Sequence, residues 1–378
     1  MIQRPPNVLI LDFRNVVTTG SQEVIRRHEK YAHSLKRITG FNESQITIAG
    51  STRTSLLIPG TFQLQFFSTD TKKWNLLGYS FKVATYIKRL NDYSTILVSG
   101  DPWESAVAAI MIRIILRRKI PTQIQIHADI GDKVWLNSKG INVFKWLVAR
   151  KTLKYASSIR TTSLYQQEKI LKSFRVNPEI LERIPVQLNL PYPDNINSKR
   201  KDFPTIGIVG RIHKDRGLGT AVKIIEIIWV KHPEVRLLVA GLGPDLEWLK
   251  IELKKINPLG KVQFLGFLEA HELENFWREC GVLLSTAPAE SFGRAMREAL
   301  VRGVPVMATF SAGSLELSSK YKESGLVLIS NPEKVETVLC AYDTARNLKV
   351  KQSLINKLME ENEVIPDNLA ESWIKILN

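Results

Sequence analysis

The chain has 378 residues, enough for two domains, and its 44% hydrophobic content is that of a globular protein. Its two cysteines are too few for a disulfide framework, and no apolar run reaches the roughly 20 residues that span a bilayer. The net charge of +16 is uneven: residues 1–190 hold 28 basic and 13 acidic side chains, and residues 191–378 hold 25 and 24. These features argue against a disulfide-rich secreted domain and an integral membrane protein, and they predict a cytoplasmic protein with reduced thiols.

The first half is predicted to alternate strands with helices. Its expected strands are Val8–Leu11, Gln45–Ala49, Phe62–Phe67, Thr95–Val98, Thr122–His127 and Ser158–Thr162. Its expected helices are Gln22–Arg37, Lys82–Leu90, Trp103–Arg117, Val143–Tyr155 and Leu164–Ser173. This alternation predicts an α/β domain over residues 1–190. Residues 191–204, which contain three prolines and a basic cluster, are predicted to be the linker to a second domain.

The second half alternates more regularly. Its expected strands are Thr205–Val209, Val235–Ala240, Val262–Leu265, Val282–Ser285 and Val304–Ala308. Its expected helices are Thr220–Val230, Leu246–Ile256, Ala270–Glu279 and Phe292–Val301. This pattern predicts a parallel, doubly wound sheet over residues 205–365, with ligands at the carboxyl ends of its strands. A final helix in residues 366–378 has an apolar side and is expected to pack back toward the N-terminal domain.

Two glutamates, Glu290 and Glu298, lie eight residues apart around the start of a predicted helix. Eight helical steps span roughly 12 Å, about the distance from the sugar to the ribose of a nucleotide sugar. Carboxylates accept hydrogen bonds from hydroxyl pairs, and the amides of Ser291, Phe292 and Gly293 are expected to be open to an anion. The alternative is that Glu290 caps the helix and Glu298 is a solvated helix residue.

A basic loop, Gly210 to Gly217, follows the first strand of the second domain, where a doubly wound sheet binds phosphate. Its Arg211 and Arg216 can form paired, charge-assisted hydrogen bonds to phosphate oxygens. They could stabilise a leaving diphosphate as a metal ion does elsewhere, and no Asp-x-Asp metal motif is present, so no metal or other cofactor is expected. The alternative is a solvated basic turn.

Five motifs over about residues 205–330 occur in a familiar order: G-R-x(4)-[KR]-G, G-x-G-P, G-F, E-x-F-G-x(4)-E-A and G-V-P-V. This order resembles the C-terminal domain of group 1 glycosyltransferases, family GT4. Residues 99–132 are similar to N-terminal segments of bacterial polysaccharide transferases. The resemblance implies the GT-B fold, in which two Rossmann-like, doubly wound domains face each other across a cleft.

The resemblance also implies roles for individual residues. Arg211 and Arg216 would grip the diphosphate, although the family usually has Lys where this chain has Arg216. Glu290 would hold the donor hexose and Glu298 the ribose hydroxyls, while His127 would face the transferred sugar. The other expected donor-site residues are Ser291, Phe292, Gly293, Gly210, Gly241 and Gly266, and Arg160 and Gly20 are possible cleft residues.

The implied function is retaining transfer of a hexosyl group from a UDP- or GDP-sugar. The implied acceptor is a saccharide or a lipid-diphosphate-linked saccharide, in the biosynthesis of a cell-surface polysaccharide or glycoconjugate. Alternatives are a GT-B-fold nucleotide-sugar epimerase and a non-catalytic nucleotide-sugar binding protein. The basic charge also allows nucleic-acid binding, but no such motif is present, and no nucleic acid is expected as a partner.

Basic helices of the first half carry interleaved apolar residues. The predicted helix Val143–Tyr155 combines Lys145, Arg150, Lys151 and Lys154 with aromatic and aliphatic side chains. Such a helix can lie on an anionic bilayer surface. We therefore predict peripheral attachment to the inner membrane face through the basic N-terminal domain.

Overall fold

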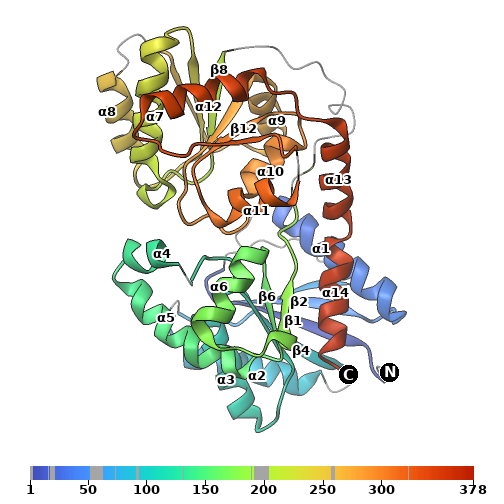
Figure 1. Cartoon of the computed structure of the whole chain (residues 1–378). Coiled ribbons are helices and arrows are strands. Elements are labelled where there is room, and N and C mark those ends of the chain that lie inside the picture. The colour runs from blue at the N-terminus through green and yellow to red at the C-terminus, as the bar shows by residue number, and fades with distance from the viewer. Residues whose placement is uncertain are drawn as a thin grey trace. The chain divides into compact units, whose positions relative to one another are not determined.

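The computed structural model describes residues 3–15, 17, 22–51, 63–72, 74–90, 93–130, 132–188, 190, 204–256, 260–321 and 323–378. It forms two compact units, one made of Met1–Gln187 with Val364–Asn378 and the other of Leu188–Glu363 (Figure 1). The expected cleft residue Gly20 and nearly all of the expected linker, residues 191–203, lie outside the described residues.

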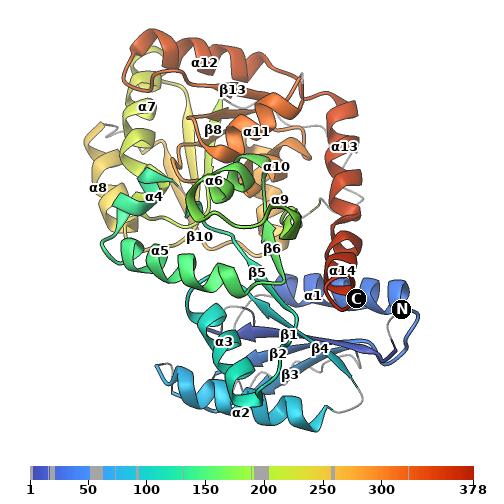
Figure 2. The ribbon, with the colours of Figure 1, turned by 60° about the horizontal axis from the view of Figure 1, so that its bottom comes forward.

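The first unit is built on a seven-stranded parallel sheet with the order β3-β2-β1-β4-β5-β6-β7. Its strands are β1 (Pro6–Asp12), β2 (Gln45–Gly50), β3 (Leu64–Ser68), β4 (Ser94–Ser99), β5 (Thr122–Gln125), β6 (Ser158–Thr161) and β7 (Leu181–Arg183). All seven residues of the central strand β1 are buried, because helices cover both faces of the sheet (Figure 2). This explains the continuous apolar run Val8–Leu11 within the strand.

The helices of this unit are α1 (Gln22–Thr39), α2 (Leu76–Arg89), α3 (Glu104–Leu116), α4 (Lys133–Ser138), α5 (Ile141–Thr152), α6 (Leu164–Phe174) and α14 (Ile365–Lys375). Single 3-10 turns cover Leu153–Tyr155 and Pro178–Ile180. Helix α2 begins earlier than the expected Lys82, because the Asn75 side chain accepts a hydrogen bond from the Gly78 amide at 2.8 Å and caps it. Two elements, α4 and β7, were not expected, since each is too short to show an apolar period.

Helix α14 returns the chain to the first unit and packs beside α1 (Figure 1). Its Trp373 is fully buried, and the indole Nε1 donates to Gln123 Oε1 at 2.9 Å. The amide of Gln123 in turn donates to Ser372 Oγ at 2.7 Å. The buried apolar side of the C-terminal helix is therefore part of the first core.

The second unit has a six-stranded parallel sheet with the order β10-β9-β8-β11-β12-β13. Its strands are β8 (Thr205–Val209), β9 (Arg236–Ala240), β10 (Val262–Gly266), β11 (Val282–Ser285), β12 (Val306–Ala308) and β13 (Leu326–Leu328). The strand order reverses between β8 and β11. Both units therefore have the doubly wound, Rossmann-like topology that the sequence predicted.

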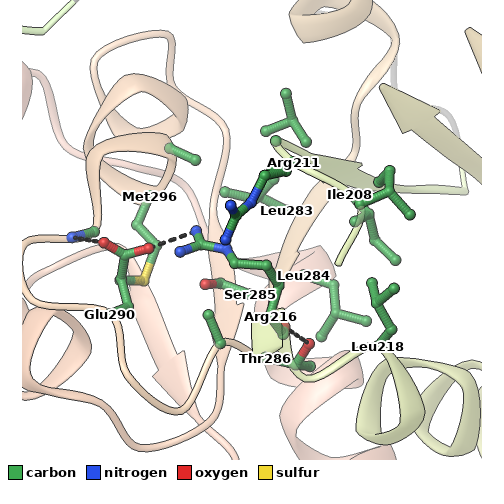
Figure 3. A pocket seen from close by; sticks show the side chains of 16 residues that line it. Ile208, Arg211, Arg216, Leu218, Leu283, Leu284, Ser285, Thr286, Glu290 and Met296 are labelled. Carbon is green, nitrogen blue, oxygen red and sulfur yellow. Dashed lines mark hydrogen bonds and ion pairs between the residues drawn. The ribbon is translucent and has the colours of Figure 1, made fainter. Parts of the chain in front are cut away.

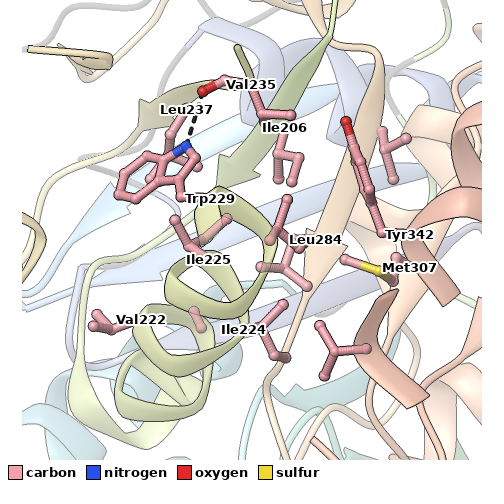
Figure 4. Packing of buried hydrophobic residues seen from close by; sticks show 14 of the residues in the cluster. Ile206, Val222, Ile224, Ile225, Trp229, Val235, Leu237, Leu284, Met307 and Tyr342 are labelled. Carbon is pink, nitrogen blue, oxygen red and sulfur yellow. Dashed lines mark hydrogen bonds between the residues drawn. The ribbon is translucent and has the colours of Figure 1, made fainter. Parts of the chain in front are cut away.

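The helices of the second unit are α7 (Leu218–Lys231), α8 (Leu246–Ile256), α9 (Ala270–Glu279), α10 (Arg294–Leu300), α11 (Ala312–Lys320), α12 (Val335–Asn347) and α13 (Gln352–Glu363). Lys214–Arg216 forms a 3-10 turn. Figure 4 shows Ile224 and Ile225 of α7 among the residues of the main core. Trp229 closes that core and donates from Nε1 to the Val235 carbonyl at 2.8 Å.

Candidate functional site

A pocket lies at the carboxyl ends of β8 and β11, the two neighbouring strands between which the strand order reverses. Doubly wound sheets bind ligands at this position. Its polar lining includes Arg211, Arg216 and Glu290, and its apolar lining includes Leu218 and Met296 (Figure 3). The structure thus brings together three residues that the sequence predicted to act on one ligand.

Three expected donor-site glycines lie at the ends of adjacent strands. The Gly210 amide donates to the Ala240 carbonyl at 2.9 Å, and the Gly241 amide donates to the Gly266 carbonyl at 2.6 Å. Gly210 and Gly266 have φ values of +128° and +68°, and no atom lies within 4 Å of where a Cβ would stand. A ligand can therefore approach the backbone at these two positions. Gly241 serves a different purpose, because it packs directly against Gly210.

The Gly241→Ala substitution is expected to lower the free energy of unfolding by at least about 2 kcal/mol. Its φ is +142°, and an added Cβ would lie 1.8 Å from the Gly210 carbonyl oxygen. Gly219→Ala in α7 is the matched control, because nothing lies within 4 Å of its Cβ position and its φ is not left-handed. Urea unfolding of both variants tests this; equal stabilities would contradict the packing role of Gly241.

The two arginines of the basic loop are held differently. Arg211 has a side chain that is 60% exposed, and its Nη2 lies 3.0 Å from Asp215 Oδ2. Arg216 crosses to the neighbouring loop, where its Nη2 lies 2.6 Å from Glu290 Oε2 (Figure 3). The loops are tied together at Thr286, whose hydroxyl donates to the Gly217 carbonyl at 3.0 Å. The Arg211 side chain is therefore largely exposed to solvent, and the Arg216 guanidinium is paired with Glu290.

Glu290 makes two bonds within its own turn. Its Oε1 accepts a hydrogen bond from the Gly293 amide at 3.1 Å, and its carbonyl accepts one from the Gly313 amide at 2.8 Å. Helix α10 begins at Arg294 rather than at the expected Phe292, because Gly293 has a left-handed backbone with φ +75°. The expectation that the Gly293 amide is open to an anion is therefore wrong for this structure, since Glu290 already occupies it.

The structure buries Glu298, which excludes the alternative of a solvated helix residue. Its side chain is 8% exposed, and its Oε1 accepts from Arg294 Nε at 2.8 Å. Ser291 and Phe292 are also buried. None of these three residues lines the pocket described above.

In the first unit, His127 follows β5 and has an exposed side chain, and its Nε2 lies 3.2 Å from Gln125 Oε1. Arg160 of β6 is only 3% exposed, and it donates to the carbonyls of Ile184 at 3.0 Å and Pro185 at 2.6 Å. Burial lowers the pKa of this guanidinium. Arg160, expected as a possible cleft residue, is therefore buried, and its guanidinium donates to the carbonyls that follow β7 and, from Nη1, to Gln125 Oε1 at 3.3 Å.

Residues that the sequence did not single out support the loop after β5. Lys169 Nζ lies 2.8 Å from Asp129 Oδ2 and 2.6 Å from Asp132 Oδ2. Gln166 donates to the Ala128 carbonyl at 2.9 Å, next to His127. These partners lie some 40 residues away along the chain, so no local pattern could have identified them.

Neither a metal site nor a membrane span is found in the described residues. No three His, Cys, Asp or Glu side chains there converge in an arrangement that could hold a metal ion. None of the described helices is both long and apolar enough to cross a bilayer.

Residues 194–340 match the family model described as glycosyl transferases group 1. The gpi3 subunit of the phosphatidylinositol N-acetylglucosaminyltransferase of Schizosaccharomyces pombe is 26% identical over 180 residues, covering 45% of this chain and 39% of that protein. The matches span less than half the length of the first curated relatives.

Two solved structures share the fold across 98% of the chain at 16% identity. Sucrose-phosphate synthase from Thermosynechococcus elongatus has a TM-score of 0.74 and is covered over 99% of its length. Anabaena HepE, solved in complex with UDP and glucose, has a TM-score of 0.64 and is covered over 96%. The C-terminal part of the chain, residues 194–340, thus matches the group 1 glycosyl transferases, and the chain as a whole has the GT-B fold.

Proposed function

We propose that the protein is a retaining hexosyltransferase that uses a UDP- or GDP-sugar and a saccharide or lipid-diphosphate-linked acceptor, in cell-surface polysaccharide or glycoconjugate biosynthesis. The observation that carries this proposal is the convergence of Arg211, Arg216 and Glu290 on one pocket at the reversal point of the second sheet. HepE, which shares the fold, was solved with UDP-glucose, and this supports a uridine nucleotide sugar as donor.

Arg216 and Glu290 are bonded to each other, which suggests how the donor would be received. A diphosphate carries more negative charge than one carboxylate and offers several oxygens to a guanidinium. It would therefore draw Arg216 away from Glu290 Oε2, and the freed carboxylate would accept hydrogen bonds from hexose hydroxyls. Arg211, whose side chain is mostly exposed, would bind the same diphosphate from solvent. Glu298, oriented by Arg294, would accept hydrogen bonds from the ribose hydroxyls.

In the proposed reaction the bond between the anomeric carbon and the diphosphate oxygen breaks. A bond from the acceptor oxygen forms on the same face of the sugar, and the acceptor proton passes to the departing diphosphate. Arg211 and Arg216 stabilise the negative charge that develops on this leaving group, and no metal ion is required. Glu290 aligns the hexose, and His127 contributes a further contact to the transferred sugar.

The direct test is a panel of radiolabelled UDP- and GDP-sugars, each assayed for hydrolysis or transfer with and without a chelator such as EDTA. We expect one nucleotide sugar to be turned over equally in both conditions. A crystal soaked with UDP or GDP should show the diphosphate beside Arg211 and Arg216. Binding elsewhere, or turnover that EDTA abolishes, would contradict the proposed site or its metal independence.

We further propose that the first unit attaches to an anionic membrane through the outer face of α4 and α5. The residues from Lys133 to Tyr155 include six basic side chains and no acidic one. Several large apolar side chains on this segment are exposed: Val134, Ile141, Val143, Phe144, Leu147 and Tyr155. Each Lys or Arg near an anionic bilayer contributes about 1 kcal/mol to attachment, and inserted apolar side chains add to it.

The double substitution Phe144→Ser with Leu147→Ser is expected to abolish co-flotation with vesicles that contain anionic lipid. These side chains are 64% and 50% exposed, so the folded state loses little when they are replaced. Ile251→Ser on α8 is the matched control, because Ile251 is 57% exposed beside Lys250 and Lys255, which are paired with glutamates. The proposal is contradicted if the wild type floats equally well with neutral and with anionic vesicles. It is also contradicted if the double variant floats with anionic vesicles as well as the wild type does.

A further inference from the structure

Arg297 of α10 is a buried cation that the proposed chemistry does not use. Its side chain is 4% exposed, and its Nη1 has no hydrogen-bond partner in the described part of the chain. Burial lowers its pKa to about 10, and the nearby Glu316 and Tyr321 oppose this shift. The guanidinium therefore stays charged at neutral pH. Burying a charged group costs free energy, so a guanidinium buried in the fold is expected to have a structural role.

The guanidinium is placed against the turn that carries Glu290. Its Cζ lies 3.9 Å from the centroid of the Phe292 ring, a close stacking contact. Phe292 directly precedes Gly293, whose amide donates to Glu290 Oε1 at 3.1 Å. The backbone amide of Arg297 also donates to the Gly293 carbonyl at 3.1 Å. The arginine thus contacts both Phe292 and Gly293, the second of which donates to the Glu290 carboxylate.

Helix α11 holds the other side of this turn. Glu316 is 2% exposed, and its Oε1 lies 3.7 Å from Arg297 Nη2. Gly313 donates its amide to the Glu290 carbonyl at 2.8 Å, and a Cβ on Gly313 would lie 2.6 Å from the Phe292 carbonyl carbon. The turn is therefore enclosed between Arg297 on α10 and the first residues of α11.

We infer that Arg297 is a positioning residue for sugar transfer, because it stacks on Phe292 and joins that ring to Glu316, which fixes the turn bearing Glu290. It acts through Phe292 and does not touch the substrate itself. The expected loss of kcat rests on the proposed function. The expected rigidity of the Glu290–Gly293 turn does not depend on that function.

The test compares Arg297→Met with a matched control, Arg302→Met. Arg302 is also a buried arginine near an aromatic ring, Trp277, and pairs with Glu274 of α9. Its Nη1 donates to the Glu298 carbonyl at 3.0 Å, a bond to the backbone of α10 and not to the Glu290–Gly293 turn. Measured well below both melting temperatures, Arg297→Met should lower kcat about a hundredfold, with the KM for the donor changed by no more than about threefold. Arg302→Met should lose thermal stability without a comparable loss of kcat. Arg297→Lys, which keeps the charge but not the flat guanidinium, should lie between wild type and Arg297→Met.

Hydrogen–deuterium exchange gives a readout that does not depend on activity. Arg297→Met should speed amide exchange in the peptide containing Ser291 to Gly293, and Arg302→Met should not. Unchanged exchange there, or a kcat no lower than that of Arg302→Met, would overturn the inference. If Arg297→Met does not fold, Arg297→Lys decides: wild-type kcat together with wild-type exchange would overturn it. If the wild type transfers no sugar but Arg297→Met still exchanges faster than the wild type, the proposed function is contradicted and the structural role of Arg297 is not.

Discussion

Replacing Glu290 by alanine is expected to lower kcat for sugar transfer by about a thousandfold. The substitution removes the carboxylate proposed to align the hexose, the partner of Arg216 at 2.6 Å and the acceptor of the Gly293 amide at 3.1 Å. Single-turnover transfer of a radiolabelled sugar measures the chemical step directly. Thermal unfolding, measured in parallel, should show that the variant remains folded.

Glu290→Gln separates the action of the carboxylate on the sugar from its bond to the Gly293 amide. A glutamine oxygen can still accept from the Gly293 amide, but it cannot form the ion pair with Arg216. If the carboxylate acts on the sugar, kcat should remain at least about a hundredfold below wild type although the turn is preserved. Wild-type turnover by Glu290→Gln would mean that Glu290 only caps α10, which was the alternative interpretation of the sequence.

Arg211→Ala is expected to lower kcat by about a hundredfold or more, because one of the two cations that stabilise the leaving diphosphate is lost. Its side chain is 60% exposed and its ion pair with Asp215 is at the surface, so stability should hardly change. Lys223→Ala is the matched control. Lys223 is 56% exposed and also paired with an acid, Glu333, in the same unit. It should keep wild-type kcat.

A wild-type rate for Arg211→Ala would refute the leaving-group argument for this residue. An equal loss in Arg211→Ala and Lys223→Ala would point instead to a general effect of surface charge on donor binding. Repeating the assay at high salt distinguishes these cases, since screening weakens distant surface charges much more than a direct contact with phosphate.

Much of the second unit could be predicted because its pattern is local. A parallel strand covered on both faces is a short apolar run, and the amphipathic helices between such strands repeat every 3.6 residues. All five expected strands and all four expected helices of this half are present, although α10 starts two residues late. The elements after β12, from α11 to α13, carry a weaker pattern and were not expected.

The sequence by itself determined the doubly wound architecture and the placement of Arg211, Arg216 and Glu290 at strand ends, because these follow from order along the chain. Only the tertiary structure decided that Arg216 pairs with Glu290, that Arg160 is buried, and that Arg297 lies beneath Phe292. Arg216 and Glu290, for example, are 74 residues apart. Such contacts depend on which strands become neighbours and in which register, and a local run of residues does not contain that information.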